Sequence, residues 1–271
     1  MENHAKGRAV EAVARQVRAS ILRGDLPPGS ALPGERSLSE DLGVSRLTLR
    51  SALGRLESEG LVQPVQGSGT RVLDFRASGG IDLLGHLAEV ELEGGVIPVG
   101  LLADLLEFRR MVAVELLGLV AERATAAELD ALSGTLRRLA RAVGEPERFM
   151  RLDLELARQL VHAGRNLALE LLFNTGVRIL SQHPALDVAF GANSAHAVTV
   201  YARLLDLVRS RDAKRVRRVS ARFLSALDRR TLERVAALAR SVATAAPGAA
   251  EAVPGALGAP PPATRGSEYP C

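Results

Sequence analysis

Two side chains in the stretch RLDLELARQLVHAGRN, residues 151–166, are of the types that bind metals or transfer protons. Asp153 and His162 raise three alternatives: halves of a metal site, parts of an acid–base pair, or ordinary polar residues on a helix. Asp and His four residues apart share a helix face, so that spacing allows both to ligate one ion. Here the spacing is nine residues, which puts His162 on the face opposite Asp153. The two side chains are therefore not a metal-binding pair or a dyad.

The composition narrows the class of protein. The 271 residues suffice for a small domain plus a medium one, and 47% apolar with 24% charged residues is typical of a soluble globular protein. No apolar run approaches the roughly 20 residues that span a bilayer. The N-terminal MENHAKGRAV lacks the apolar core of a signal peptide. The single cysteine, Cys271, excludes an internal disulfide framework. We therefore expect a cytoplasmic protein with no membrane partner.

Charge and aromatic content limit how nucleic acid would be bound. The net charge of +4 permits an anionic partner without requiring one. Aromatic residues make up 3% of the chain and Trp is absent. Binding by base stacking is disfavoured, since such surfaces need several exposed rings. Any DNA contacts must therefore be made with grooves and phosphates.

The chain divides into four zones. Residues 9–75 carry helical periodicity followed by a short β-rich end, and residues 76–80 form a linker within DFRASGG. Residues 81–240 are an almost continuous series of amphipathic helices broken at Gly, Pro or Asn. Residues 241–271 are rich in Ala, Pro and Gly without periodicity, which predicts a disordered tail. The predicted fold class is mainly α.

Residues 37–75 have the pattern of two helices and two short strands. SLSEDLG is a short helix closed by Gly43, which allows the tight connection that follows. Ser45 then stands at an N-cap position, and RLTLRSALGRLESEG forms a second helix that ends at Gly60. LVQPV and TRVLDF read as strands joined by QGSG. The pattern predicts a winged helix-turn-helix, with an inward face on the second helix made of Leu49, Ala52, Leu53 and Leu56.

Arg46 and Arg50 project from another face of the second helix, with Thr48 near the same end. In a winged helix-turn-helix this helix enters the major groove N-terminus first. Arginine can then pair with guanine O6 and N7, and hydroxyl groups can bind phosphate. The alternative is that both arginines belong to a solvated helix face.

The segment GDLPPGSALPGERSLSEDLGVSRLTLRSALGRLESEGLV, followed by GSGTRV, resembles the N-terminal domain of the GntR transcriptional regulators. Members of that family bind palindromic double-stranded DNA as dimers, so the resemblance implies a homodimer. Leu47 stands where relatives often have Thr, which would alter one base or phosphate contact. The resemblance implies DNA contacts at Arg36, Ser45, Arg46, Thr48, Arg50 and the wing-tip residues Gln66 and Gly67.

The helical zone resembles the effector domain of the FadR subfamily, also named the FCD type, a bundle of six or seven helices. Arg109 falls where relatives place an arginine that meets an effector's carboxylate, and the alternative for it is a surface salt bridge. Many members hold a metal with an Asp, a His four residues later and two further His. Asp153 is in place, but the other positions hold Ala157, Tyr201 and Phe223.

Without these imidazoles the site loses its transition-metal ligands. His183 and His196, in a loop and at a helix start, do not replace them. The resemblance therefore implies no metal and no cofactor. Apolar replacements favour an apolar ligand. A metal-free branch of the subfamily, which responds to long-chain acyl-CoA in fatty acid metabolism, resembles three stretches here: TRVLDFRASGGIDLLGHLAEV, DLELARQLVHAGRNLALELLFNTGVRIL and YARLLDLVRSRDAKRVRRV.

These observations predict a transcriptional regulator whose DNA affinity changes when an acyl effector binds. The run KRVRRVSAR, residues 214–222, would meet CoA phosphates, or it is a solvated basic face. The alternatives are a regulator that responds to a small carboxylate metabolite and an effector-free, constitutive dimeric repressor. An enzyme is disfavoured because the chain has no nucleophile motif, phosphate loop or HExxH helix. The predicted effector contacts are Arg109, Asp153, Ala157, Tyr201, Arg222 and Phe223.

Overall fold

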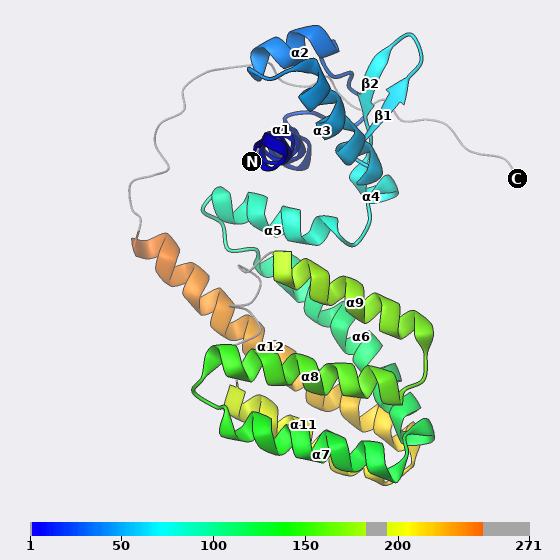
Figure 1. Cartoon of the computed structure of the whole chain (residues 1–271). Coiled ribbons are helices and arrows are strands. Elements are labelled where there is room, and N and C mark those ends of the chain that lie inside the picture. Colours follow the sequence, from blue (N-terminus) through cyan, green and yellow to red (C-terminus); the bar gives the residue numbers. More distant parts are fainter. Residues whose placement is uncertain (1, 183–193, 246–271) are drawn as a thin grey trace, which may run out of the picture.

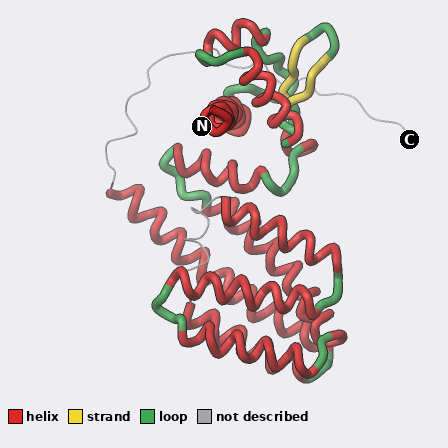
Figure 2. Tube along the Cα trace, viewed as in Figure 1, coloured by secondary structure: helices red, strands yellow, loops and turns green. Residues whose placement is uncertain are grey.

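The chain folds into a small N-terminal head on one end of a helical bundle (Figure 1). The structure is a computed structural model, which describes residues 2–182 and 194–245. Helices dominate the described chain, and one hairpin supplies its strands (Figure 2). The prediction of a mainly α protein, with a winged helix-turn-helix followed by a helical domain, is confirmed.

The head contains three helices and the hairpin. These are α1 (Glu2–Arg23), α2 (Glu35–Asp41), α3 (Arg46–Ser58), β1 (Val62–Val65) and β2 (Gly69–Val72). The strands are antiparallel, with Val62 opposite Val72. The predicted inward face of α3 is buried against α1. The core that holds α3 in place is made of Val13, Ala14, Val17, Ile21, Leu32, Leu49, Ala52, Leu53, Leu56, Leu61, Val62, Val72 and Leu83.

A buried arginine fixes the far end of α3 to α1. Arg18 is 2% exposed, and its Nε and Nη2 donate to the two Glu59 carboxylate oxygens at 2.7 and 2.6 Å. Glu59 is the C-cap residue of α3. Bidentate pairs of this kind fix orientation as well as distance. The contact therefore sets the direction in which the exposed start of α3 points.

The prediction that TRVLDF forms the second strand is wrong beyond Val72. The chain leaves the sheet there and begins the single turn α4 (Phe75–Ser78). The reason is local, because the Asp74 carboxylate accepts a hydrogen bond from the Arg76 N–H at 3.0 Å and caps this turn. The Ser78 hydroxyl then donates to the Gly60 carbonyl at 2.6 Å, which packs α4 against the end of α3.

The bundle is built on two long helices, α6 (Val99–Arg123) and α12 (Ala213–Ala245), which share the most extensive helix contact. The other described helices are α5 (Leu83–Glu93), α7 (Ala126–Arg141), α8 (Pro146–Ala163), α9 (Leu167–Gln182) and α11 (Ser194–Arg209). Seven helices among the described residues agree with the expected six or seven. Their common core is apolar and lies between α6, α7, α8, α11 and α12.

The end of α12 differs from the predicted boundary. The helix continues to Ala245, whereas the disordered tail was expected from residue 241. Residues 246–271, including Cys271, lie outside the described residues, as does His183. The other predicted domain boundaries remain predictions. In the described chain no helix has the length and apolarity that a membrane crossing requires.

A capping box starts α7. The Thr125 hydroxyl accepts from the Glu128 N–H at 3.2 Å, and the Glu128 carboxylate accepts from the Thr125 N–H at 2.6 Å. The bonds from Thr125 lower the pKa of Glu128. The box therefore stabilises the fold above the usual Glu pKa, and this stabilisation is lost as pH falls through the lowered value.

We predict that Thr125→Ala lowers the free energy of unfolding by about 1 kcal/mol at pH 7. Urea denaturation followed by circular dichroism measures this loss. Thr199→Ala is the matched control, because Thr199 lies inside α11 on an exposed surface and its hydroxyl donates to the Ala195 carbonyl of the preceding turn. An equal loss in both variants would show that the box contributes nothing.

Candidate nucleic-acid interface and effector pocket

The start of α3 is held by a hydroxyl pair. Ser45 is the N-cap, and its Oγ accepts from the Thr48 N–H at 3.1 Å and lies 2.9 Å from Thr48 Oγ1. Thr48 is 8% exposed, whereas Ser45 is exposed. Of the two residues predicted to contact DNA here, Ser45 is therefore accessible in this structure, and Thr48 holds it in place.

The predicted base-reading arginines lie on the outer surface of the head. Arg50 Nε donates to Glu35 Oε2 at 2.7 Å, and Arg36 Nε donates to Glu40 Oε1 at 3.1 Å. All four side chains are at least 40% exposed, so these pairs are weak and DNA can compete for the arginines. Arg46 is exposed and has no ion-pair partner within residues 2–182 and 194–245.

The wing tip lies at the same outer end. Gln66 and Gly67 are exposed in the turn between β1 and β2, and Gly67 has φ +75°. Figure 1 shows α2, the start of α3 and the hairpin tip together at the end of the head farthest from the bundle. This surface combines a helix N-terminus, exposed arginines and a projecting hairpin, which suits a DNA major groove and its phosphates.

In the bundle, side chains from three helices meet around Asp153. Tyr201 on α11 donates a hydrogen bond to the Asp153 carboxylate on α8, and the positive charge of Arg109 on α6 lies nearby. Burial raises the pKa of Asp153, which the Arg109 charge and the Tyr201 bond oppose. Burial also raises the pKa of Tyr201, so its phenol remains a neutral donor. The structure thus brings together three of the residues predicted from sequence.

Arg109 also has a partner that the sequence did not indicate. Its Nη2 donates to Asp228 Oδ1 at 3.0 Å, and Arg110 Nη1 donates to Asp228 Oδ2 at 2.7 Å. Asp228 lies on α12 and is 2% exposed. Arg109 is thus in an ion pair, as the expected alternative had it, but its partner is a buried acid and the Arg109 side chain is 39% exposed. A ligand carboxylate would have to compete with Asp228 for Arg109.

The remaining predicted effector contacts divide into two groups. Ala157 is half-buried one turn after Asp153, and Phe223 on α12 packs against the same core as Tyr201. Arg222, by contrast, is exposed. In the basic run 214–222, the Arg217 guanidinium donates hydrogen bonds to the carboxylates of Glu115 and Glu122 at 2.8 and 3.0 Å. The run therefore resembles a solvated basic face more than a phosphate site.

Neither His162 nor His196 is among the groups that act on the Asp153 carboxylate. His162 is exposed in the last turn of α8, as its spacing predicts. His196 near the start of α11 contacts Arg230, and burial together with the charges of Arg230 and nearby arginines lowers the pKa of His196. Within the described residues, no three His, Cys, Asp or Glu side chains are arranged to hold a metal ion.

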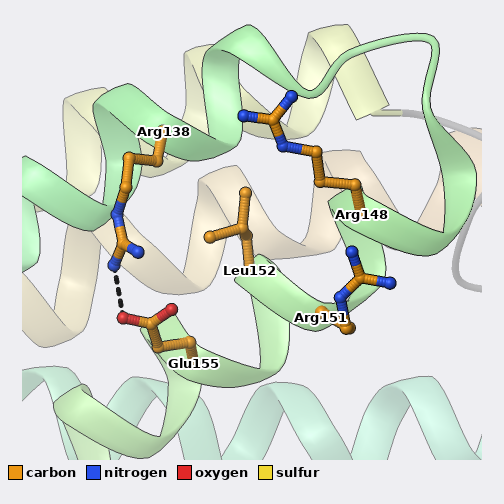
Figure 3. A pocket seen from close by; sticks show the side chains of 5 residues that line it. All are labelled: Arg138, Arg148, Arg151, Leu152 and Glu155. Atoms are coloured by element: carbon orange, nitrogen blue, oxygen red, sulfur yellow. Dashed lines mark hydrogen bonds and ion pairs between the residues drawn. The ribbon is translucent and has the colours of Figure 1, made fainter.

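A hollow between α7 and α8 was missed by sequence analysis (Figure 3). Its volume is about 340 Å³, and Arg138, Arg148, Arg151, Leu152 and Glu155 line it. Arg138 pairs with Glu155, and Arg148 pairs with Glu145 at 3.1 Å. The charges of two of the three arginines that line the hollow are thus balanced by glutamates. The hollow depends on the packing of α7 against α8, for which the sequence carries no local signal.

Family models match both parts of the chain. The model described as bacterial regulatory proteins, gntR family, matches residues 9–72, and the FCD domain model matches residues 104–226. The chain thus carries a gntR-family head followed by an FCD domain. The family description and the names of the curated relatives are those of regulators, which agrees with the prediction that this chain is not an enzyme.

Curated relatives carry names of the same kind. The HTH-type transcriptional regulator Mce2R of Mycobacterium tuberculosis is 40% identical over 129 residues, which is 48% of this chain and 52% of the relative. A fatty acid metabolism regulator protein of Shewanella oneidensis is 44% identical over 91 residues, covering 34% of this chain and 38% of the relative. The match thus spans about half of one relative's length and less of the other's.

A solved structure has a similar fold. Lar, described as controlling expression of the Listeria monocytogenes agr system, aligns with a TM-score of 0.53 at 14% identity. The alignment covers 84% of this chain and 97% of Lar. At this identity the similarity concerns the fold alone.

Proposed function

We propose that this protein is a homodimeric transcriptional regulator that binds palindromic double-stranded DNA and releases it when an apolar acyl ligand binds the bundle. The exposed N-terminal end of α3, with Arg46 and Arg50 facing outward and Ser45 at its cap, is the observation that carries the proposal. A cytoplasmic location, where such a regulator meets the chromosome, is part of the same proposal.

The proposed DNA contacts follow from the geometry of the head. Arg46 and Arg50 would read base edges in the major groove, and Ser45, with Thr48 behind it, would bind a phosphate. Arg36 on α2 would add a further phosphate contact after leaving Glu40. Gln66 and Gly67 on the wing would contact the adjacent groove or backbone.

The proposed effector is a fatty acyl-CoA or a related acyl compound. Asp153, Tyr201 and Arg109 supply a small polar group beside an apolar core that includes Phe223, with Ala157 one turn away. Apolar sites with a few polar anchors suit such ligands. The name of the Shewanella relatives, fatty acid metabolism regulator protein, is consistent with this class. Arg222, predicted from the sequence as an effector contact, is exposed on the bundle surface in a run that resembles a solvated basic face, so the proposal does not depend on it.

Helix α5 offers a route from the bundle to the head. Leu83, at its start, is part of the head core and is 2% exposed. Ala88, farther along, packs with Ile179 of α9. A ligand that repositions α9 would therefore displace the head through α5. Such a ligand changes DNA affinity only if it binds the DNA-incompatible arrangement more tightly.

A thermal-shift titration tests the ligand class. We expect oleoyl-CoA to raise the melting temperature, because a ligand that binds only the folded state stabilises it. Free coenzyme A and succinate are the controls. Stabilisation by succinate with no response to oleoyl-CoA would favour a small-carboxylate regulator. If none of the metabolites tested changed stability or DNA affinity, the constitutive repressor would be favoured.

Asp153 gives a pH-dependent prediction. Because its pKa is raised in the folded state, its contribution to stability is largest at acid pH and is lost as pH rises through the raised value. We therefore expect Asp153→Asn to be more stable than the unmodified protein at pH 7, with the difference shrinking toward pH 4. Thermal denaturation across this range measures the difference. A pH-independent difference would contradict a raised pKa of Asp153 in the folded protein.

A further inference from the structure

The start of α3 carries an apolar side chain that the DNA contacts above do not use. Leu47 is 60% exposed, although it directly follows Arg46 in the helix. Among the described residues of the head, no other large apolar side chain is this exposed. A single exposed leucine is common on protein surfaces, so exposure alone does not indicate a function. A functional role has to be inferred from where the leucine lies.

The position of Leu47 places it with the groove-facing residues. It is the second residue of α3, whose N-terminal end enters the groove in a helix-turn-helix. The next residues on the same outer stripe are Arg50 and Ser51, both exposed, and the Ser51 hydroxyl bonds back to the Leu47 carbonyl at 3.0 Å. Gly54, one turn further, has open space around it. Leu47 thus projects without a covering neighbour.

We propose that Leu47 determines specificity by packing on the C5-methyl group of a thymine beside the base read by Arg46 or Arg50. This inference rests on the proposed DNA-binding function. The leucine side chain has no donor or acceptor, so it cannot bind phosphate or a polar base edge. In the major groove the thymine methyl is the apolar group that such a side chain can recognise. A protein partner is disfavoured because arginines flank Leu47 and no apolar patch continues from it.

The experiment removes the apolar group from each side of the contact in turn, the thymine methyl from the DNA and most of the Leu47 side chain from the protein. Duplexes that bind the full-length protein are first selected from a random library. Each thymine of the selected site is then replaced by deoxyuridine, which lacks the C5-methyl group, and the dissociation constant is measured by fluorescence anisotropy. We expect one thymine per half-site at which this replacement weakens binding about fourfold, the effect of burying one methyl group.

Two variants test the result further. In Leu47→Ala the deoxyuridine replacement should have a much smaller effect at that position, because the shorter side chain buries less of the methyl group, whereas Ser51→Ala, on the same exposed stripe, should keep the full response. Since Leu47 is exposed, neither of these variants should change the melting temperature by more than a few degrees.

Two outcomes would overturn the inference in different ways. A selected site that is insensitive to deoxyuridine at every thymine, or equally sensitive in Leu47→Ala, would show that Leu47 does not read the methyl group. The DNA-binding proposal would survive if Arg46→Ala still weakened binding. A library in which no duplex is enriched would overturn the DNA-binding function itself and the inference with it.

Discussion

Arg46→Ala should weaken binding to the selected duplex by about 1–3 kcal/mol, which is roughly fivefold to 150-fold. Arg46 is exposed at the first position of α3 and has no ion-pair partner in the described part of the chain, so its full donor set is free for a guanine edge. Arg50→Ala should have a smaller effect within this range, because Arg50 must first leave Glu35. Discrimination between bases should relax at one position of each half-site.

Fluorescence anisotropy with the selected duplex and with a scrambled duplex separates specific from non-specific binding. Arg148→Ala is the matched control, since Arg148 is an exposed arginine of the bundle that is paired with Glu145. It removes the same charge far from the DNA and should leave the affinity for both duplexes nearly unchanged. A footprint unchanged by both Arg46→Ala and Arg50→Ala would refute the assignment of α3 as the recognition helix.

Gly60→Ala should be the most destabilising small substitution in the head, with a loss of about 2–5 kcal/mol in the free energy of unfolding. A Cβ at Gly60 would lie 2.2 Å from the Ser78 carbonyl oxygen and 2.8 Å from its carbon. Both atoms belong to the backbone of α4, which cannot yield without moving the linker. The residue also has φ +73°, a left-handed conformation that costs about 1–2 kcal/mol for a side-chain-bearing residue.

Gly43→Ala provides the comparison, because it has nearly the same φ, +63°, but open space around the added Cβ. It should therefore lose only the conformational part, about 1–2 kcal/mol. Urea unfolding followed by circular dichroism gives both values. Equal losses in the two variants would show that α4 does not press on the end of α3 in solution.

Local signals in the sequence predicted the head well. Ser45, Gly60 and the apolar spacing of residues 49–56 identified α3, its cap and its buried face, because each depends on neighbours within one or two turns. The same kind of reasoning extended the second strand too far. The Asp74 side chain caps the turn of α4, and this competes with strand pairing. The residues TRVLDF are compatible both with a longer strand and with a strand that ends before such a turn.

In the helical domain, the sequence did not reveal which distant side chains contact one another. The family pattern placed Asp153, Tyr201 and Arg109 in one region, and the structure brings them together. The pair between Arg109 and Asp228 joins residues 119 positions apart, and no periodicity indicates which of many acids will meet an arginine. The burial of Thr48 was likewise invisible, since helix position alone does not reveal that its hydroxyl faces Ser45.

The central claim is that an acyl ligand in the bundle controls DNA binding by the head. Its most direct test is the affinity of the full-length protein for the selected duplex, measured by fluorescence anisotropy with and without saturating oleoyl-CoA. Coupling between the two sites should raise the dissociation constant at least fivefold, while free coenzyme A leaves it unchanged. An affinity that oleoyl-CoA does not alter, or that free coenzyme A alters equally, would contradict the claim.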